Sequence, residues 1–232
     1  MVREKTASTP TVRAVEYDES RWKTLRLKRE AAAPPMRALF EHSPIVHGSL
    51  ARGDVHAGSD VDIVIDHTVP SFAVELALRD YTFTRREIVQ ATPWHLIKGH
   101  IYLEDDLSVT FPLVKPTPQE EEFYTFGGSL DLDSMEGGLR VPGIDKRLML
   151  IEPTDGGHLE TSIVGMEPRA AKTVGVGIAT VKERVEVLSR RDSVGRTGVY
   201  LQRVLTDDQS FEDVLRVLAS RDTNVKRRFR QG

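Results

Sequence analysis

The sequence predicts an α+β chain of two domains, and three observations lead to this fold class. Over residues 18–113, apolar runs with strand alternation follow helical patterns. Between about residues 117 and 164, glycine pairs separate short apolar runs, a texture typical of hairpins. Helical spacing returns over residues 178–219. At 232 residues the chain can bury a core and hold one large domain or two modest ones.

The predicted division has four parts, which are listed in chain order. They are a flexible lead-in at 1–17, a first domain at 18–116 with a short mixed sheet and helices mainly on one side, a C-terminal α+β domain at 117–225, and a basic tail at 226–232.

Composition limits the class of protein. The formal charge of −3 is close to neutral, so the whole chain lacks the basic field that would indicate nucleic-acid binding. The absence of cysteine excludes disulfides, thiolate metal sites and a cysteine nucleophile. No apolar run approaches the roughly 18 residues that span a bilayer, and residues 1–5 do not lead into an apolar core. We therefore expect a soluble, cytoplasmic protein that does not contact membranes.

The first elements follow from periodicity and turn residues. Asp18 or Ser20 could cap a helix that carries Trp22 and Leu25 and, on the opposite face, a basic set of Arg21, Lys23, Arg26, Lys28 and Arg29. Pro34-Pro35 should end or kink this helix, because proline lacks the N–H that the helix needs. A short helix over 36–41 and strands over 45–47 and 61–65 should follow, with a glycine-flanked turn at 52–58.

Alternation and turn signals place the remaining elements. We expect a helix over 71–79, strands over 86–91, 95–103 and 107–113 with a turn at 104–106, and a connector or capped helix from 116 to 122. Hairpins should then lead to helices over 178–191 and 211–219. The tail Lys226–Arg230 is interpreted as a mobile cationic end, and Trp22 and Trp94 as core or near-core aromatics.

Residues 47–65, which read HGSLARGDVHAGSDVDIVI, are the most informative stretch of the chain. Strand alternation puts Asp60 and Asp62 on one face, roughly 6.5–7 Å apart along the strand. Two carboxylates at that separation can share a divalent cation such as Mg²⁺. Upstream, Gly48 permits close approach of the backbone to a ligand, and Ser49 offers a hydroxyl and an N–H to phosphate oxygens. A phosphate cradle beside a metal-binding pair indicates nucleotidyl transfer.

This strand-turn-strand segment resembles the signature of the polymerase-β-like nucleotidyltransferase superfamily. The form Gly48-Ser49 followed by Ser59-Asp60-Val61-Asp62 is similar to minimal nucleotidyltransferases and to the catalytic head of archaeal-type CCA-adding enzymes. The likeness covers residues 45–66 firmly and about 20–115 loosely, and it does not extend to the C-terminal half.

The resemblance implies metal-dependent transfer of a nucleoside monophosphate from a triphosphate to an acceptor hydroxyl. Asp60 and Asp62 would be the catalytic residues and would bind the metal ions, Mg²⁺ or Mn²⁺, and ATP is the expected nucleotide. The residues expected to bind the nucleotide are Gly48, Ser49, Arg52, Ser59 and Lys98.

The family pattern also has a third carboxylate on a neighbouring strand, and this chain departs from it. At the corresponding place it carries Thr110, whose hydroxyl cannot replace a charged metal ligand. The acidic residues nearby in the sequence are Glu87, Glu104, Asp105 and Asp106. Asp106 shares a strand face with Thr110 but lies roughly 13 Å from it along the strand, so we do not expect it to substitute.

Two classes of function follow. The first is a nucleotidyltransferase of the EC 2.7.7 type, with an RNA end, a protein side chain or a small molecule as acceptor. The alternative is a catalytically weakened nucleotide-binding or RNA-binding regulatory protein, as Thr110 suggests. In the RNA-binding version, the contacts come from residues 178–191, the loop at Arg196 and the tail. A homo-oligomer is compatible with either.

Overall fold

The structure is a computed structural model that describes residues 11–104, 106–195 and 198–230. The chain forms two compact units, and both are discontinuous in sequence. Unit 1 contains the described residues of Met1–Ala31, Val46–Ser59 and Glu122–Thr197. Unit 2 contains those of Ala32–Ile45, Asp60–Glu121 and Gly198–Gly232.

The elements wholly inside unit 1 are β1 (Arg13–Glu16), α2 (Ser49–Arg52), β7 (Ser129–Asp131), α5 (Leu132–Glu136), β8 (Gly143–Ile144), β9 (Met149–Thr154), β10 (Gly157–Ser162), α6 (Glu167–Val174) and α7 (Ile178–Val194). Those wholly inside unit 2 are the 3-10 helix η1 (Phe40–His42), β3 (Val61–Val64), α3 (Ser71–Ala77), β4 (Arg85–Gln90), β5 (Ile97–Tyr102), β6 (Leu107–Pro112), β11 (Leu201–Val204), α8 (Phe211–Arg221) and α9 (Thr223–Arg230). Three elements contain a unit boundary: α1 (Glu19–Ala38), β2 (Ile45–His47) and α4 (Pro118–Gly127).

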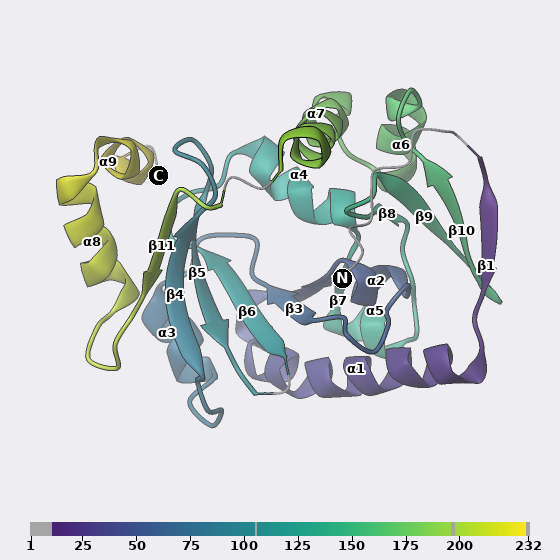
Figure 1. Cartoon of the computed structure of the whole chain (residues 1–232). Helices are drawn as coiled ribbons and strands as arrows, with labels where there is room; N and C mark the ends of the chain where they lie inside the picture. Colours follow the sequence, from purple (N-terminus) through teal and green to yellow (C-terminus); the bar gives the residue numbers. More distant parts are fainter. Residues whose placement is uncertain (1–10, 105, 196–197, 231–232) are drawn as a thin grey trace. The chain divides into compact units, whose positions relative to one another are not determined.

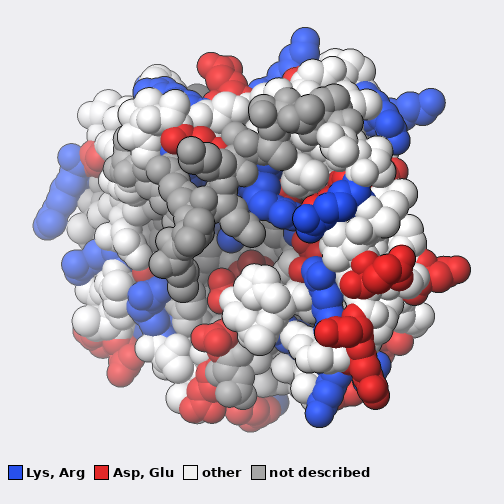
Figure 2. All heavy atoms as spheres, turned by 45° about the vertical axis from the view of Figure 1, so that its right-hand side comes forward, with Lys and Arg blue, Asp and Glu red and all other residues white. Residues whose placement is uncertain are grey.

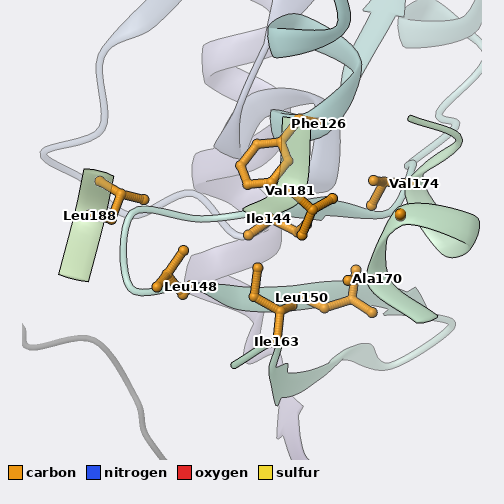
Figure 3. Packing of buried hydrophobic residues seen from close by; sticks show 10 residues of the cluster. Phe126, Ile144, Leu148, Leu150, Ile163, Ala170, Val174, Val181 and Leu188 are labelled. Atoms are coloured by element: carbon orange, nitrogen blue, oxygen red, sulfur yellow. The ribbon is translucent and has the colours of Figure 1, made fainter. Parts of the chain in front are cut away.

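Unit 1 is built on an antiparallel sheet with the strand order β1-β10-β9-β8. Figure 3 shows apolar side chains of this sheet, of α4 and of α6 and α7 pointing toward one another. Leu148 and Ile163 are almost completely buried in this cluster. The hairpin texture and the helix expected over 178–191 are thereby confirmed.

Unit 2 is built on a mixed sheet with the strand order β11-β4-β5-β6-β3, as Figure 1 shows. Only β3 and β6 run parallel, and the other neighbouring pairs are antiparallel. The predicted α+β class, the mixed sheet and the strands from β3 to β6 are confirmed. Strand alternation gives this sheet two chemically different faces.

One face of the unit 2 sheet is apolar and forms the core of the unit. Its fully buried apolar side chains come from every strand except β11, and they include Ile63, Ile88, Ile97, Ile101, Val109 and Phe111. From α8, Phe211 packs edge-on against Phe111, with ring centroids 5.2 Å apart. Gly99 is required beneath them, because a Cβ there would lie 2.7 Å from the Phe111 ring. The core therefore attaches α8, near the C-terminus, to β5 and β6, which lie about a hundred residues earlier in the chain.

The opposite face of the sheet is polar. By register, Asp62 lies beside Ser108, Ser108 beside Tyr102, and Thr110 beside His100. Glu87 is opposite His100 on the next strand. This face carries the acidic residue of β3 and is the part of unit 2 where polar chemistry is concentrated.

The double proline neither ends α1 nor starts a second α-helix, contrary to the sequence prediction. Pro34 and Pro35 lie inside α1, and the amide of Leu39 still donates to the carbonyl of Pro35 over 3.0 Å. The prolines deprive the carbonyls of Glu30 and Ala31 of their helical donors. Ala32, Met36 and Leu39 are fully buried at helical spacing, and this packing offsets the loss.

Both expected chain ends differ from the prediction. Residues 13–16 of the expected lead-in form β1, whose partner β10 is more than 140 residues away and therefore gives no local signal. Most of the expected mobile tail belongs to α9, in which Val225 is fully buried. Residues 1–10 and 231–232 lie outside the described residues. The predicted boundary at residue 117 is not followed by the units, since residues from 198 onward belong with the β3–β6 sheet.

Two further observations concern the surface. Over the described residues, no helix combines the length and the apolar character needed to cross a membrane. On the face drawn in Figure 2, acidic and basic side chains of the described residues are intermingled. This distribution agrees with the near-neutral formal charge.

Candidate functional site

The Gly48-Ser49 pair forms a sharp turn between β2 and α2 in unit 1. Gly48 has φ 77° and ψ −135°, a conformation that glycine adopts without steric cost. Its amide donates to the carbonyl of Gly128 over 2.9 Å, and its carbonyl accepts from Arg52 over 3.0 Å. The first N–H groups of a helix have no acceptor within that helix, so α2 begins with donors at Ser49. The positive φ thus explains why glycine occupies position 48. Ser49, the next residue, is half-buried.

Arg52 is buried and holds the loop after α2. Its Nε and Nη2 donate to the two carboxylate oxygens of Asp54, each over 3.0 Å, and its Nη1 donates to the carbonyl of Gly127 over 2.6 Å. A guanidinium paired in this way on both edges fixes backbone geometry. Nucleotide binding by Arg52 stays a prediction, and its contacts assign it a structural role.

Three cations of α1 hydrogen-bond to the backbone of the segment from Leu50 to Ser59. Arg29 donates to the carbonyl of Leu50 and Arg21 to that of Asp54, both over 3.1 Å. Lys28 donates to the carbonyl of Ser59, the residue before Asp60. The basic side of α1 is therefore more than a solvated face, and it supports the loop of the signature. The cations are evident in the sequence but this role is not, because their acceptors are backbone carbonyls, which every residue type has.

Ser59 also shapes its own turn. Its hydroxyl accepts from the amide of His56 over 3.0 Å, and its amide donates to the carbonyl of His56 over 3.0 Å. These bonds close the turn directly before Asp60. The Ser59 hydroxyl, which was expected to contact the nucleotide, is thus already hydrogen-bonded to the His56 amide.

Asp60 and Asp62 lie at the start of β3 in unit 2, and both are exposed. Asp60 precedes the strand by one residue, and Asp62 is its second residue. On the parallel neighbour β6, Ser108 donates from its hydroxyl to Oδ1 of Asp62 over 2.9 Å. This bond orients the Asp62 carboxylate on the polar face of the sheet.

Ser108 rather than Thr110 is the residue beside Asp62. The register pairs Thr110 with Val64, one step further along the strands, and the Thr110 hydroxyl lies 2.9 Å from Nδ1 of His100. On the polar face of β6, the two residues beside β3 are therefore the hydroxyl residues Ser108 and Thr110. The sequence does not single out Ser108, because the family likeness on this strand depends on the proline that follows Thr110. Strand alternation nevertheless puts residues 108 and 110 on one face.

The acidic residues considered as substitutes do not complete a metal cluster. Glu87 is on β4, three strand spacings or about 14 Å from β3, and it is almost fully buried. It accepts from Tyr102 over 2.6 Å and from Gln202 over 2.9 Å. Asp106 accepts at its carbonyl from the amide of Val61 over 3.1 Å, and its φ of 58° takes it out of the strand. Glu104 is exposed, and Asp105 lies outside the described residues.

Within the described ranges, no three histidine, aspartate or glutamate side chains come together as a metal-holding group. Asp60 and Asp62 therefore remain a pair. Two carboxylates are the usual protein share of a Mg²⁺ site that also binds substrate phosphates.

Lys98 and His100 share the polar face of β5. Lys98 is half-buried and lies opposite Pro112 of β6 and Val89 of β4. Burial, with a smaller contribution from the charge of Lys98, lowers the pKa of His100 from 6.5 to about 4. His100 is therefore neutral at physiological pH and acts as a hydrogen-bonding group without charge.

Replacing Arg52 by Met should lower the free energy of unfolding by about 3 kcal/mol or more, because Asp54 then keeps a largely buried charge without a partner. Urea denaturation measures this change. The matched control is Arg216→Met, which removes an exposed partner of Asp213 and should change stability by less than about 0.5 kcal/mol. Equal effects of the two substitutions would contradict the structural role.

The low pKa of His100 predicts a pH effect on stability. Between about pH 6.5 and pH 4 the unfolded chain binds a proton at this position that the folded chain does not, so stability falls as the pH is lowered. His100→Gln should flatten this decline by about 3 kcal/mol, at about 1.4 kcal/mol per pH unit.

Urea titrations from pH 7 to pH 4 check the prediction for His100, with His67→Gln as the control at an exposed histidine. An NMR titration of the His100 ring gives its pKa directly, and a midpoint near 6.5 would show the assignment to be wrong.

The comparisons with known proteins agree with this geometry. Residues 39–126 match the family model described as nucleotidyltransferase domain. This range contains the Gly48 turn, Asp60, Asp62 and all of β4, β5 and β6. No curated protein and no solved structure matches the chain. The likeness seen in the sequence is thus confirmed: this chain carries, at residues 39–126, a nucleotidyltransferase domain consistent with the polymerase-β-like superfamily.

Proposed function

We propose that the protein is a nucleotidyltransferase of the EC 2.7.7 type. It would move a nucleoside monophosphate from a triphosphate, ATP in the first instance, to an acceptor hydroxyl with the help of Mg²⁺ or Mn²⁺ and would release pyrophosphate. The observation that carries the proposal is the exposed pair Asp60 and Asp62 at the start of β3, inside the matched domain. Both side chains are hard oxygen donors, which suit these cations.

The residues fit a divalent cation that binds together with its substrate. Asp60 and Asp62 would hold it, and the Ser108 hydroxyl keeps the Asp62 carboxylate oriented. Such a cation supplies charge neutralisation to the phosphates and to the attacking and leaving oxygens. The chain's own contribution is to position the two carboxylates that would bind the cation.

The five predicted nucleotide-binding residues divide into two groups. Gly48 and Ser49 are proposed to receive phosphate oxygens at the turn before α2, and Lys98 to neutralise phosphate charge from β5. Arg52 and Ser59 are proposed to act through the loop that they hold, since their polar atoms bond to protein groups. The acceptor classes remain an RNA end, a protein side chain or a small molecule. Cytoplasmic location and homo-oligomer formation stay predictions from the sequence.

Transfer of label from α-³²P-labelled ATP, in Mg²⁺ or Mn²⁺ and with and without bulk RNA, tests the proposal. Asp60→Asn and Asp62→Asn should each reduce transfer to background, because the cation loses one of two charged protein ligands. Asp66→Asn, a carboxylate four residues beyond Asp62 and beside His67, should leave transfer unchanged. Transfer that survives both motif substitutions would refute the assignment.

A second candidate is a nucleotide-binding protein with weakened turnover. The observation that favours it is the hydroxyl pair on β6, where Ser108 lies beside Asp62 and Thr110 bonds to His100. Neither hydroxyl can take a proton from an acceptor as a carboxylate does. Saturable ATP binding that depends on Asp60 and Asp62, without transfer to any acceptor, would favour this candidate.

Ser108→Asp discriminates between the two candidates. If the hydroxyl limits turnover, a carboxylate at this place should raise labelled transfer by up to about 100-fold, the lower end of what a general base contributes. In the absence of metal the same substitution should lower stability, because two carboxylates become neighbours across the strands. Thr110→Asp, which faces Val64 instead, is the matched control and should not raise transfer.

A further inference from the structure

The C-terminal helix α9 of unit 2 has the highest fraction of cationic residues of any element among the described residues. Its eight residues include Lys226, Arg227, Arg228 and Arg230 and no acidic side chain. This concentration contrasts with a chain whose formal charge is −3. The four cations differ in their surroundings, and these differences show which of them face solvent.

Arg228 holds the helix in place. It is buried, and its Nη2 donates to Glu120 over 2.5 Å and to the carbonyl of Lys115 over 3.1 Å. Val225, on the same side of α9, is fully buried. Val225 and Arg228 therefore attach one side of α9 to the rest of unit 2.

Lys226 and Arg230 are exposed, and in the part of the chain that the structure describes neither has a carboxylate partner. Phe229 lies between them in sequence and is also exposed. Two solvent-facing cations without a partner leave a local positive surface.

Trp94, in the turn between β4 and β5, is 69 % exposed, contrary to the expectation of a core or near-core aromatic. The guanidinium carbon of Arg227 lies 3.7 Å from the centroid of its ring. An indole ring with a cation on one face and most of its surface in water is an unusual use of a large apolar side chain.

A chain of hydrogen bonds fixes this cation–π pair. Arg227 donates to the side-chain oxygen of Asn224 over 3.0 Å, and Asn224 donates to the hydroxyl of Tyr200 over 3.0 Å. Tyr200 in turn donates to Asp222 over 2.6 Å. The cation of this pair is thus held in place by three residues, Asn224, Tyr200 and Asp222.

We propose that Trp94 with Lys226, Arg227 and Arg230, hereafter the α9 platform, binds the single-stranded segment of a nucleic-acid acceptor. A base stacks on the open face of Trp94 while Lys226 and Arg230 contact phosphates, the combination used for single strands without base-specific readout. A lipid surface is disfavoured, because α9 exposes only one apolar side chain, Phe229, to solvent. An acidic peptide would use the charges but has no aromatic face to stack.

The α9 platform belongs to the same unit as Asp62. Lys115, which anchors Arg228, follows the end of β6, and Ser108 beside Asp62 is near its start. This inference rests on the proposed function only where it calls the bound nucleic acid the acceptor of the transfer. The binding itself needs neither nucleotide nor metal.

Fluorescence anisotropy of labelled 12-residue oligonucleotides, single-stranded RNA and DNA, titrated with the full chain at several salt concentrations, tests the proposal without triphosphate or metal. Trp94→Ala should weaken binding roughly 5- to 100-fold, the range for loss of one stacked base, and Trp94→Phe should restore most of it. The double variant Lys226→Gln with Arg230→Gln should reduce the slope of log K against log salt by about 1.4.

The matched control removes two exposed cations of α6, Lys172→Gln with Arg169→Gln, and should leave both affinity and slope unchanged. Unfolding midpoints of all variants exclude misfolding as the cause. Equal weakening by the α6 and α9 pairs, or wild-type affinity of Trp94→Ala, would overturn the platform. So would equal binding of an acidic peptide of matched charge.

The two proposals can fail separately. Oligonucleotide binding that persists in Asp60→Asn without any labelled transfer by the wild-type chain would refute the catalytic proposal and leave the platform standing. Labelled transfer to RNA that is indifferent to Trp94→Ala and to the loss of Lys226 and Arg230 would refute the platform alone.

Discussion

The hydrogen bonds from α1 to the segment between Leu50 and Ser59 are the constraint on which the candidate site depends. That segment contains one four-residue helix and is otherwise turns and irregular backbone, so its carbonyls need partners from elsewhere. Arg21, Lys28 and Arg29 supply them from one helix. Because Ser59 is bonded directly to Asp60, the contact from Lys28 to the carbonyl of Ser59 fixes the backbone directly before the acidic pair.

The unit 2 sheet separates packing from chemistry by its two faces. The apolar face is filled by isoleucines, valines and Phe111 and is closed by Phe211. The other face carries Asp62, two hydroxyls and a neutral histidine. In the family pattern a third acid occupies the neighbouring strand, and here Ser108 orients Asp62 instead. The residue of β6 beside Asp62 is therefore the position at which the two proposed functions differ.

Local patterns in the sequence predicted those elements whose formation depends on neighbouring residues. The strands β3 to β6, the helix α3 and the Gly48 turn follow from alternation and turn residues, and the structure contains all of them. The continuation of α1 through Pro34 and Pro35 could not be predicted, because burial of Ala32, Met36 and Leu39 outweighs the lost hydrogen bonds. The exposure of Trp94 and the burial of Arg228 depend on α9, whose packing no local pattern shows. The Ser108–Asp62 bond needs the register between two strands that are far apart in sequence.

The interleaving of the two units has a consequence for how the chain is made. Unit 1 needs β10 to pair with β1, and unit 2 needs α8 to cover strands that were synthesised about a hundred residues earlier. Neither unit can close until most of the polypeptide has left the ribosome, and contacts between such distant segments slow folding. The unit 2 sheet, which carries the acidic strand, is therefore completed late, and shortened chains ending before residue 198 would lack β11 and α8.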